Sequence, residues 1–324
     1  MSRVLNVSEL GPPGAKFVDF PDGFDRIDFS GLPNSWLEQV ITRPRLSRYR
    51  AAFAAASRSA GAYVISHLPR MTAAVADGLA VYRSRPPHLA FSFNFTELPT
   101  GIDLWRFRRS LRAVDRFCVF SSFESEAYSD LFHIDPARFR RLLWAQDPPA
   151  VSAESIPGLP PMYVSAVGGE GRDYKTLMRA ASLLRDVPFV VVARPYNDFG
   201  SVPSNVRLLH NLSADLTWRI ARDSLCLVVP LKDRTTACGH ITLVSGHLLG
   251  IPMISSHSEA TREYTDQVSM YEPGDVPGLA ELIRRHVDAA DTLRQRARSR
   301  ISEQIRNFSR AAWQAEISDF LLTH

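Results

Sequence analysis

The sequence is poor in cysteine, has only three lysines, and lacks a long apolar run. Its three cysteines, Cys118, Cys226 and Cys238, do not have the close spacing of metal ligands, so we expect reduced thiols in a cytoplasmic protein. No stretch reaches the roughly 18 apolar residues that a membrane-spanning helix needs. The first residues also lack the apolar segment of a secretory signal. With 324 residues, 45% of them hydrophobic and 22% charged, the composition is that of a globular protein of two domains.

Acidic motifs for metal binding are absent as well. The chain has no Asp-x-Asp motif, and no group of His, Cys and Asp residues has the spacing of metal ligands. We therefore expect a site without metal and without a bound cofactor.

Positive charge is concentrated in the first half of the chain. Residues 1–150 contain 19 Arg or Lys against 15 Asp or Glu, whereas the two signs balance in the remainder. Arginine alternates with aromatic and aliphatic residues at 43–50, 106–112 and 138–144. This pattern suits an anionic membrane surface, and a solvated helix face in an arginine-rich protein is the alternative. We recognise no nucleic-acid-binding module and expect no nucleic-acid partner.

Strand-like and helical segments alternate twice along the sequence, which predicts an α/β fold with parallel sheets. A proline-rich stretch at 148–161 separates the two series and is typical of an interdomain linker. In the first series we expect strands at 3–10, 62–66, 88–95 and 117–121, and helices at 46–60, 71–82, 104–114 and 124–132. In the second we expect strands at 162–167, 188–193, 206–209, 225–230 and 252–255, and helices at 175–184, 214–223, 242–249 and 278–306. An amphipathic helix at 307–321, capped by Asn307 or Ser309, ends the chain.

Two turns containing glycine precede helical patterns in the second half. One is Gly168-Gly-Glu-Gly-Arg-Asp-Tyr-Lys175 and the other is Gly239-His-Ile-Thr242. A helix that begins after such a turn presents free backbone N–H groups and the positive end of its dipole, which suit a phosphate. Two of these turns predict a diphosphate at the edge of a parallel sheet, as in a nucleotide-sugar site.

The segments at 165–177 and 243–254 resemble the donor domain of GT-B glycosyltransferases, specifically the group 1 (GT4-like) set common in bacterial polysaccharide assembly. The resemblance is good over about 160–321 and only architectural over 1–150. It implies two facing Rossmann-like domains: an acceptor domain at 1–150, a nucleotide-sugar donor domain at 151–306, and a C-terminal helix at 307–324 that crosses back to the first domain.

The resemblance also implies what the protein does. We expect a hexosyltransferase that needs no metal and uses a nucleoside-diphosphate sugar, with UDP favoured over GDP. The acceptor would be a lipid-linked glycan in exopolysaccharide or lipopolysaccharide assembly, at the cytoplasmic face of the inner membrane. A sugar-nucleotide epimerase of the same fold and a catalytically silent nucleotide-sugar-binding subunit are the alternatives.

The chain departs from the family pattern at several positions. Two glutamates that many GT4-like enzymes carry are matched here by Ala237 and Ser245, which counts against the epimerase and favours the silent subunit. Arg172 stands where a lysine often faces the donor phosphate, and the usual arginine a few residues earlier is missing. Because arginine keeps its charge and binds phosphate through two N–H groups, the phosphate role survives.

The resemblance and the two turns together assign donor-binding residues. Arg172 would stabilise the charge that develops on the leaving phosphate, the alternative being a surface ion pair with Asp173 or Glu170. Ser245 would offer the ribose a hydroxyl, and Glu263 would reach the ribose or cap a helix. The two turns and the loops after neighbouring strands add Gly168, Gly169, Gly239, His240 and Thr242 for phosphate, and Arg194, Tyr196 and Asn211 for the base.

Acceptor residues are expected where strands of the first half end. His67 and Glu97 are the candidates for the base that deprotonates the acceptor hydroxyl, with Asp103 as a further one. A histidine bonded to backbone is the alternative for His67, and the sequence does not decide between inverting and retaining chemistry. The loop at 11–16, which includes Lys16, is a further place for acceptor contact.

Overall fold

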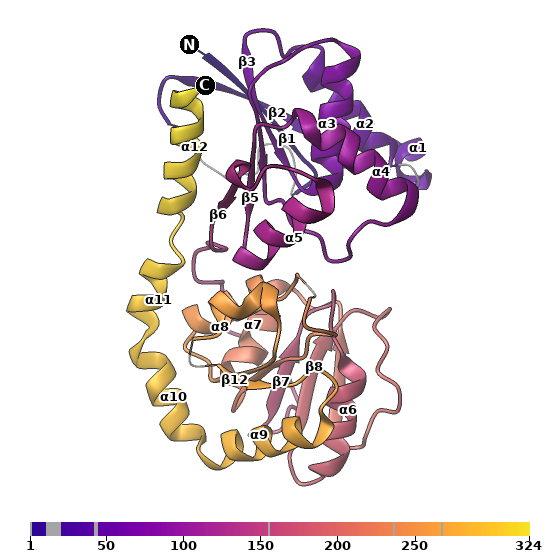
Figure 1. Ribbon diagram of the computed structural model, residues 1–324. Helices are drawn as coiled ribbons and strands as arrows, with labels where there is room; N and C mark the ends of the chain where they lie inside the picture. Colours follow the sequence, from indigo (N-terminus) through magenta and orange to yellow (C-terminus); the bar gives the residue numbers. More distant parts are fainter. Residues whose placement is uncertain (1, 11–20, 42–44, 155, 236, 267) are drawn as a thin grey trace. The chain divides into compact units, whose positions relative to one another are not determined.

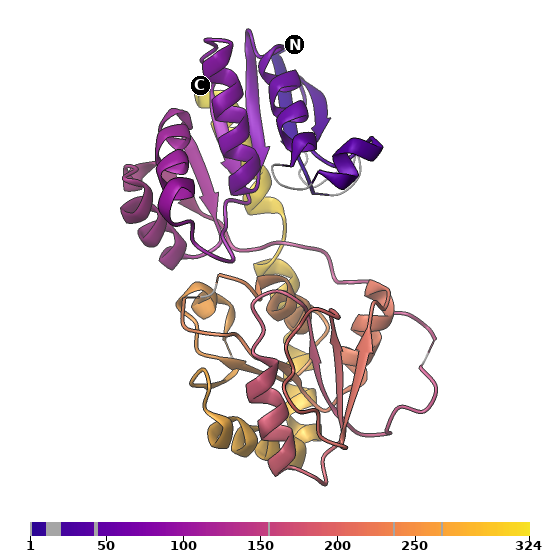
Figure 2. The same ribbon diagram turned by 90° about the vertical axis from the view of Figure 1, so that its right-hand side faces the viewer.

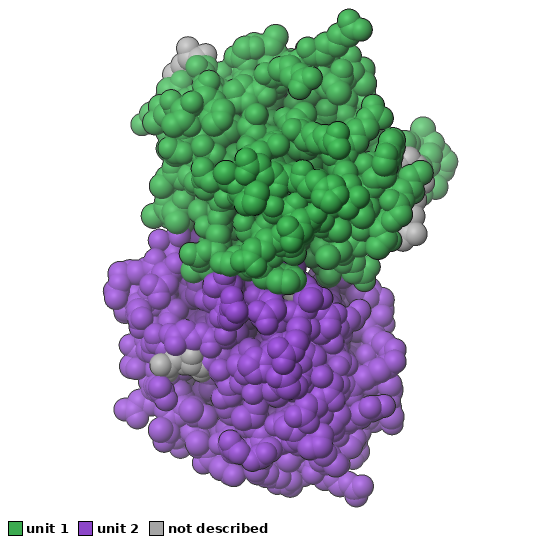
Figure 3. Space-filling view, viewed as in Figure 1, with its two compact units in different colours: residues 1–143, 310–324 green, residues 144–309 purple. Residues whose placement is uncertain are grey.

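The structure is a computed structural model of the whole chain, and it describes all residues except 1, 11–20, 42–44, 155, 236 and 267. The chain forms two compact units (Figure 3). Unit 1 comprises Met1–Leu143 and Arg310–His324, and unit 2 comprises Trp144–Ser309. The boundaries between the units follow Leu143 and Ser309, a few residues from the expected 150 and 306. Among the described residues, no helix combines the length and the apolar character needed to cross a bilayer.

Unit 1 is built on a parallel sheet of six strands in the order β2-β1-β3-β4-β5-β6. Its inner strands are apolar and buried, as expected where helices cover both faces of a parallel sheet. The strands are β1 (Ser2–Ser8), β2 (Phe24–Ser30), β3 (Ala62–His67), β4 (His88–Phe91), β5 (Arg116–Val119) and β6 (Phe139–Arg141).

Helices lie on both faces of this sheet (Figures 1 and 2). They are α1 (Trp36–Val40), α2 (Leu46–Ala56), α3 (Pro69–Val81), α4 (Gly101–Ser110), α5 (Ser122–Phe132) and α12 (Ala311–Thr323). Helices α2 to α5 cover one face, where aromatic rings from α4, α5 and the sheet form one core. Helix α12 covers the other face: the Trp313 ring lies 5.2 Å from that of Phe91, and the Trp313 indole donates to the carbonyl of Leu143.

Unit 2 contains a second parallel six-stranded sheet, in the order β12-β11-β10-β7-β8-β9. Strand β8 (Phe189–Ala193) is buried over its whole length and packs in the core with α6 and α9. The other strands are β7 (Val164–Val167), β9 (Val206–His210), β10 (Leu227–Val229), β11 (Met253–Ser256) and β12 (Ser269–Tyr271). The helices are α6 (Tyr174–Leu183), α7 (Ala214–Asp223), α8 (His240–Leu248), η3 (Glu259–Tyr264), α9 (Val276–Asp288), α10 (Ala290–Ser299) and α11 (Ile301–Asn307).

The expected fold class, two α/β units with parallel sheets, is confirmed, and several expected elements are wrong in detail. Strands β2, β6 and β12 were missed, because β2 and β6 are rich in charged residues and β12 is only three residues long. The single helix expected at 278–306 is three helices, α9 to α11. Helix α12 begins after Arg310, and neither Asn307 nor Ser309 caps it.

Candidate functional site

The order of the strands in unit 2 creates a crevice at one edge of the sheet. From the central strand β7 the chain moves outward to β8 and β9, then returns to the other side of β7 with β10, β11 and β12. The loops that leave β7 and β10 therefore turn to opposite faces of the sheet. Ligands of open α/β sheets bind at such a switch point, outside the carboxyl ends of the strands. Both glycine turns predicted from the sequence lie there.

Arg172 joins the two turns. Its guanidinium donates to the Thr242 hydroxyl in α8 at 2.9 Å and to the Glu170 carbonyl at 3.0 Å, and it contacts the Cys238 sulfur at 3.5 Å. Its backbone forms an isolated bridge with Leu231 after β10. Two segments that lie 70 residues apart in the sequence are thus held side by side.

The position that lies against the Arg172 guanidinium requires a glycine, Gly168. Gly168 has a φ of +124°, and a Cβ atom added to it would lie 2.9 Å from the Arg172 Nη2 atom. A side chain at this position would therefore strain the backbone and displace the guanidinium. The first turn is shaped around Arg172.

Arg172 is a buried cation held by neutral acceptors. Only 7% of its surface is exposed, and its Nε atom is buried without a hydrogen-bond partner. The alternative of an ion pair is not what the structure shows, since the Asp173 carboxylate caps α6 through Thr176 and that of Glu170 accepts from Tyr196. Among the described residues Arg172 has no carboxylate within ion-pair distance. A buried charge without a counterion is costly, so this position favours an anionic ligand.

The second turn presents the start of α8. Gly239 has a φ of +101° and lies against Leu231, and no side chain caps the helix. The first N–H groups of α8 have no partner within the helix, so they are available to an anion beside Arg172. The His240 imidazole is used elsewhere: it bonds to the Ala260 carbonyl at 2.9 Å, and burial lowers its pKa to about 4. His240 thus contributes backbone to the site, and its ring supports η3.

Residues after β8 form a wall beside the first turn. A Cβ atom on Gly169 would lie 2.7 Å from Arg194 and 3.0 Å from the Tyr196 hydroxyl, and the Asn197 amide donates to the Gly169 carbonyl. Arg194 and Tyr196 are exposed. Asn211, predicted to contact the base, is an exposed residue with a φ of +54° directly after β9, the next strand outward.

Ser245 lies in the middle of α8 and is fully buried. Its hydroxyl accepts a hydrogen bond of 2.7 Å from the Gln146 amide, and the Gln146 oxygen accepts one from the Trp144 indole. The ribose contact expected of Ser245 therefore requires that Gln146 move. Sequence reasoning missed Gln146, because it lies just before the proline-rich stretch and outside both glycine turns. Glu263 is half-buried in η3, the segment that follows β11.

In unit 1 the structure corrects the role expected of His67. The ring is fully buried at the end of β3, bonds to the Asn6 side chain at 2.9 Å, and burial lowers its pKa to about 3. An acceptor hydroxyl has no access to it, so His67 is a structural residue. Glu97 is exposed in the loop after β4, and Asp103 in α4 lies 3.6 Å from Arg70. The loop at 11–16 lies outside the described residues.

Within the part of the chain that the structure describes, no three His, Cys, Asp or Glu side chains gather where they could hold a metal ion.

The whole chain is similar to solved structures of glycosyltransferases. HepE from Anabaena, in complex with UDP and glucose, has a TM-score of 0.72 and 13% sequence identity, with 100% of both chains covered. The lipopolysaccharide outer core galactosyltransferase WaaB has a TM-score of 0.64 and 12% identity, with 99% of each chain covered. Sucrose-phosphate synthase from Thermosynechococcus elongatus has a TM-score of 0.68 and 14% identity, covering 99% of this chain and 88% of the other.

These similarities show that the chain has the GT-B fold. No protein-family model and no curated protein sequence matches it.

Proposed function

We propose that the protein is a glycosyltransferase that moves a sugar from a nucleoside-diphosphate sugar to an acceptor hydroxyl. The observation that carries the proposal is Arg172, a buried cation without a carboxylate partner among the described residues, fixed to Thr242 at the start of α8. Breaking the bond between the sugar and the diphosphate places negative charge on the leaving phosphate. A cation and N–H donors already in place stabilise that charge without reorganisation.

The nucleotide would lie along the first turn. Its diphosphate would contact Arg172 and the backbone of Gly168 and of residues 239–242, while Arg194, Tyr196 and Asn211 would surround the base. UDP is the favoured nucleotide, because HepE, which shares the fold, is described in complex with UDP and with UDP-glucose. The reaction would need no metal.

The acceptor would be a lipid-linked glycan, which requires a protein that works at a membrane surface. Two helices of unit 1 expose large apolar side chains: Trp36 is 72% exposed and Val40 61% on α1, and Ile102 is 77% and Trp105 60% on α4. The Arg109 guanidinium lies over the Trp105 ring. Apolar and aromatic residues beside arginine suit the anionic surface of the inner membrane. Arg106 and Arg108, in contrast, donate to Tyr49 and to the Leu131 carbonyl.

Vesicle co-sedimentation tests this membrane role. The double variant Trp36→Glu with Trp105→Glu should lose most of its binding to vesicles of phosphatidylcholine and phosphatidylglycerol. Leu322→Glu is the matched control, since Leu322 is 76% exposed on α12. Equal binding by the double variant and the control would contradict peripheral attachment.

The transferase proposal is tested in two steps. A thermal-shift screen against UDP, GDP, CMP, ADP and their sugar conjugates identifies the donor, because a nucleotide at a hundred times its dissociation constant stabilises the folded state by about 2.7 kcal/mol. Release of the nucleotide from that donor is then measured with bacterial membranes as the source of acceptor. Release of the nucleotide that depends on the acceptor supports a transferase. If no nucleotide or conjugate raises the melting temperature, the proposal is overturned.

A catalytically silent nucleotide-sugar-binding subunit is the second candidate. It is favoured by Ser245, whose buried hydroxyl is held by Gln146 where related enzymes carry a glutamate, and by the burial of His67. The two steps above separate the candidates: donor binding without release under any acceptor condition would establish the silent subunit and exclude the transferase.

A further inference from the structure

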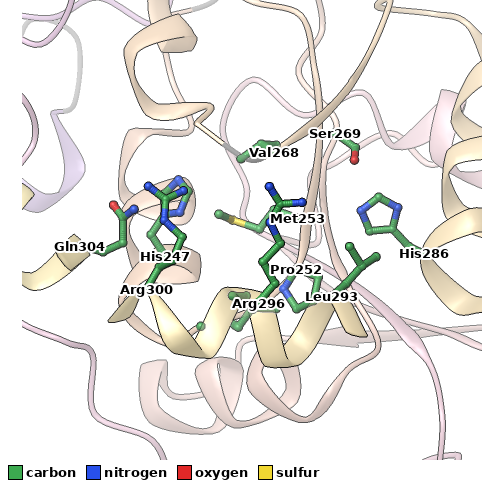
Figure 4. A pocket seen from close by; sticks show the side chains of 13 residues that line it. His247, Pro252, Met253, Val268, Ser269, His286, Leu293, Arg296, Arg300 and Gln304 are labelled. Carbon is green, nitrogen blue, oxygen red and sulfur yellow. The ribbon is translucent and has the colours of Figure 1, made fainter. Parts of the chain in front are cut away.

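A cavity of about 310 Å³ lies within unit 2, at the opposite end of α8 from the second glycine turn. The end of α8, the first residues of β11 and β12, and helices α9, α10 and α11 enclose it (Figure 4). It therefore lies at the amino-terminal edge of the sheet, whereas Arg172 and both glycine turns lie at the carboxyl-terminal edge. The cavity is no part of the site proposed for the nucleotide sugar.

The cavity has an apolar floor. Ile251, Met253 and Val268 are all buried and line it, and Leu293 adds an apolar wall. Ala297 completes the wall on α10. Gly250, with a φ of +62°, lets α10 approach the turn after α8, because a Cβ atom there would lie 3.0 Å from the Arg298 backbone.

Three polar side chains line the same cavity without a hydrogen-bond partner among the described residues: the Gln304 amide, the Ser269 hydroxyl and the Arg296 guanidinium. Only 4% of the surface of Gln304 is exposed, and its side chain borders the cavity. In Figure 4 Arg296 extends from α10 toward Met253. Buried polar groups are nearly always bonded in proteins, so this amide is suited to a ligand or to water.

The other charged or titratable groups around the cavity are already occupied. Arg300 pairs with Asp266 at 2.6 Å and with Glu303 at 3.0 Å. His247 bonds to the Tyr264 carbonyl and His286 to the Leu282 carbonyl. Arg296 remains as the cation whose guanidinium has neither an ion pair nor a hydrogen bond within the described part of the chain.

We propose that this cavity binds a small organic anion, with its apolar body on the floor and its carboxylate or phosphate bound by Arg296. Gln304 and Ser269 would offer hydrogen bonds to other parts of the ligand. An apolar lining with a few polar groups is characteristic of small-molecule sites. At about 310 Å³ the cavity is near the lower end of their usual size, roughly 300–1,000 Å³, which fits one ring or a short chain.

The cavity is physically connected to the glycine turns. Helix α8 carries His247 at the cavity and Thr242, which holds Arg172, at its other end. Strand β11 provides a second connection: Met253 lines the cavity, and at the far end the Ser256 hydroxyl bonds to the Leu231 backbone, which bridges Arg172.

Calorimetric titration of the full-length protein without nucleotide tests the site. The probes are phenyl phosphate, benzoate and the neutral benzyl alcohol. We expect saturable binding of at least one anion and none of the alcohol, and the stronger anion distinguishes a phosphate ligand from a carboxylate ligand. Arg296→Gln should weaken binding about tenfold, the effect of losing one charge-assisted hydrogen bond. Arg298→Gln is the matched control, an exposed arginine of α10 that does not line the cavity.

A second variant tests the cavity itself. Ala297→Phe fills it and should abolish binding, while circular dichroism and the melting temperature show that the variant folds. If it does not fold, Arg296→Gln against Arg298→Gln remains decisive. Absence of saturable anion binding, or equal weakening by both arginine variants, would overturn the proposal. Neither result depends on whether the protein binds or uses a nucleotide sugar.

Discussion

The carboxyl-terminal edges of the two sheets use polar residues in different ways. In unit 2 Arg172 is buried beside carbonyl and hydroxyl groups, with no carboxylate to neutralise it among the described residues. In unit 1 the buried charge is neutralised: Glu9, directly after β1, has a side chain only 5% exposed, and Arg45 and Arg48 pair with it at 2.8 Å. The contrast distinguishes an edge suited to an anion from one whose charges stabilise the fold.

Two buried histidines of unit 1 show the same use of polar residues to stabilise the fold. Burial lowers the pKa of both His67 and His88 in unit 1 to about 3, and each ring is bonded to a neighbouring side chain, Asn6 for His67 and Ser66 for His88. Such rings stay neutral and inaccessible at physiological pH. Neither ring is then suited to act as a base, and Glu97, exposed in the loop after β4, is the residue we predict.

The largest expected effect is on catalysis by Glu97. Glu97→Gln should slow acceptor-dependent release of the nucleotide by a factor of roughly 10²–10⁴, the usual contribution of a general base. Nucleotide affinity should not change, because the donor residues belong to unit 2. Glu126→Gln, at an exposed glutamate of α5, is the control and should retain activity. If Glu97→Gln has the wild-type rate, Glu97 is not the base.

Next in size is the effect of a side chain at Gly168. Gly168→Ala and Gly274→Ala both place alanine at positive φ, which costs on the order of 1–3 kcal/mol of unfolding free energy. Only at Gly168 does the new Cβ atom meet Arg172, since nothing lies within 4 Å at Gly274. Urea unfolding should show similar losses in both variants, whereas stabilisation by nucleotide should disappear in Gly168→Ala alone. Equal nucleotide binding by the two variants would mean that the first turn is not shaped for Arg172.

A smaller effect is expected at Thr242. Thr242→Val keeps the shape of the side chain and removes the hydroxyl that accepts from Arg172 at 2.9 Å. The free energy of unfolding should fall by about 1.5–3 kcal/mol, the range for a hydrogen bond to a charged group. Thr242→Ser should restore most of it. Unfolding curves of all three proteins check this, and full stability of the valine variant would contradict the role of Thr242 in fixing the guanidinium.

Over a single pH unit, the smallest effect is the pH dependence that the buried histidines of unit 1 impose. The pKa of His67 is about 3 in the folded state against an ordinary 6.5, so below pH 6.5 the unfolded chain binds a proton that the folded chain excludes. Stability is therefore present above pH 6.5 and is lost as pH falls toward 3, by up to about 1.4 kcal/mol per pH unit for each ring. His67→Asn should have a shallower loss between pH 7 and pH 5 in urea titrations. An unchanged slope would show that this ring is not buried in neutral form.

Much of unit 2 could be predicted from the sequence, because its signals are local. The apolar composition of a strand such as Phe189–Ala193 predicts a buried strand. The glycines at 168–171 and 239 predict turns, because glycine adopts the positive φ angles that these turns have. Edge strand β2 could not be predicted, since Asp25, Arg26 and Asp28 break its apolar pattern, and pairing with β1 decides its structure.

The sequence could not predict the role of a residue where that role depends on tertiary contacts. His67 follows a strand end, as functional residues often do, and nothing local indicates that Asn6 and the Phe91 ring enclose it. Gln146 lies just before the proline-rich stretch, and its bond to Ser245 joins positions 99 residues apart. In the same way, the pairing of Arg172 with Thr242 is visible only once the sheet order brings β7 and β10 together.

Calorimetric titration of UDP into three proteins tests the central claim most directly: the wild type, Arg172→Met and Arg179→Met. Methionine keeps part of the buried volume at position 172 and removes the charge, and Arg179 is an exposed arginine on α6 that serves as the control. The account predicts that UDP binds the wild type and the Arg179 variant equally well, and that Arg172→Met weakens binding at least tenfold, by about 1.5–3 kcal/mol. Equal binding by all three proteins, or none by the wild type, would contradict it.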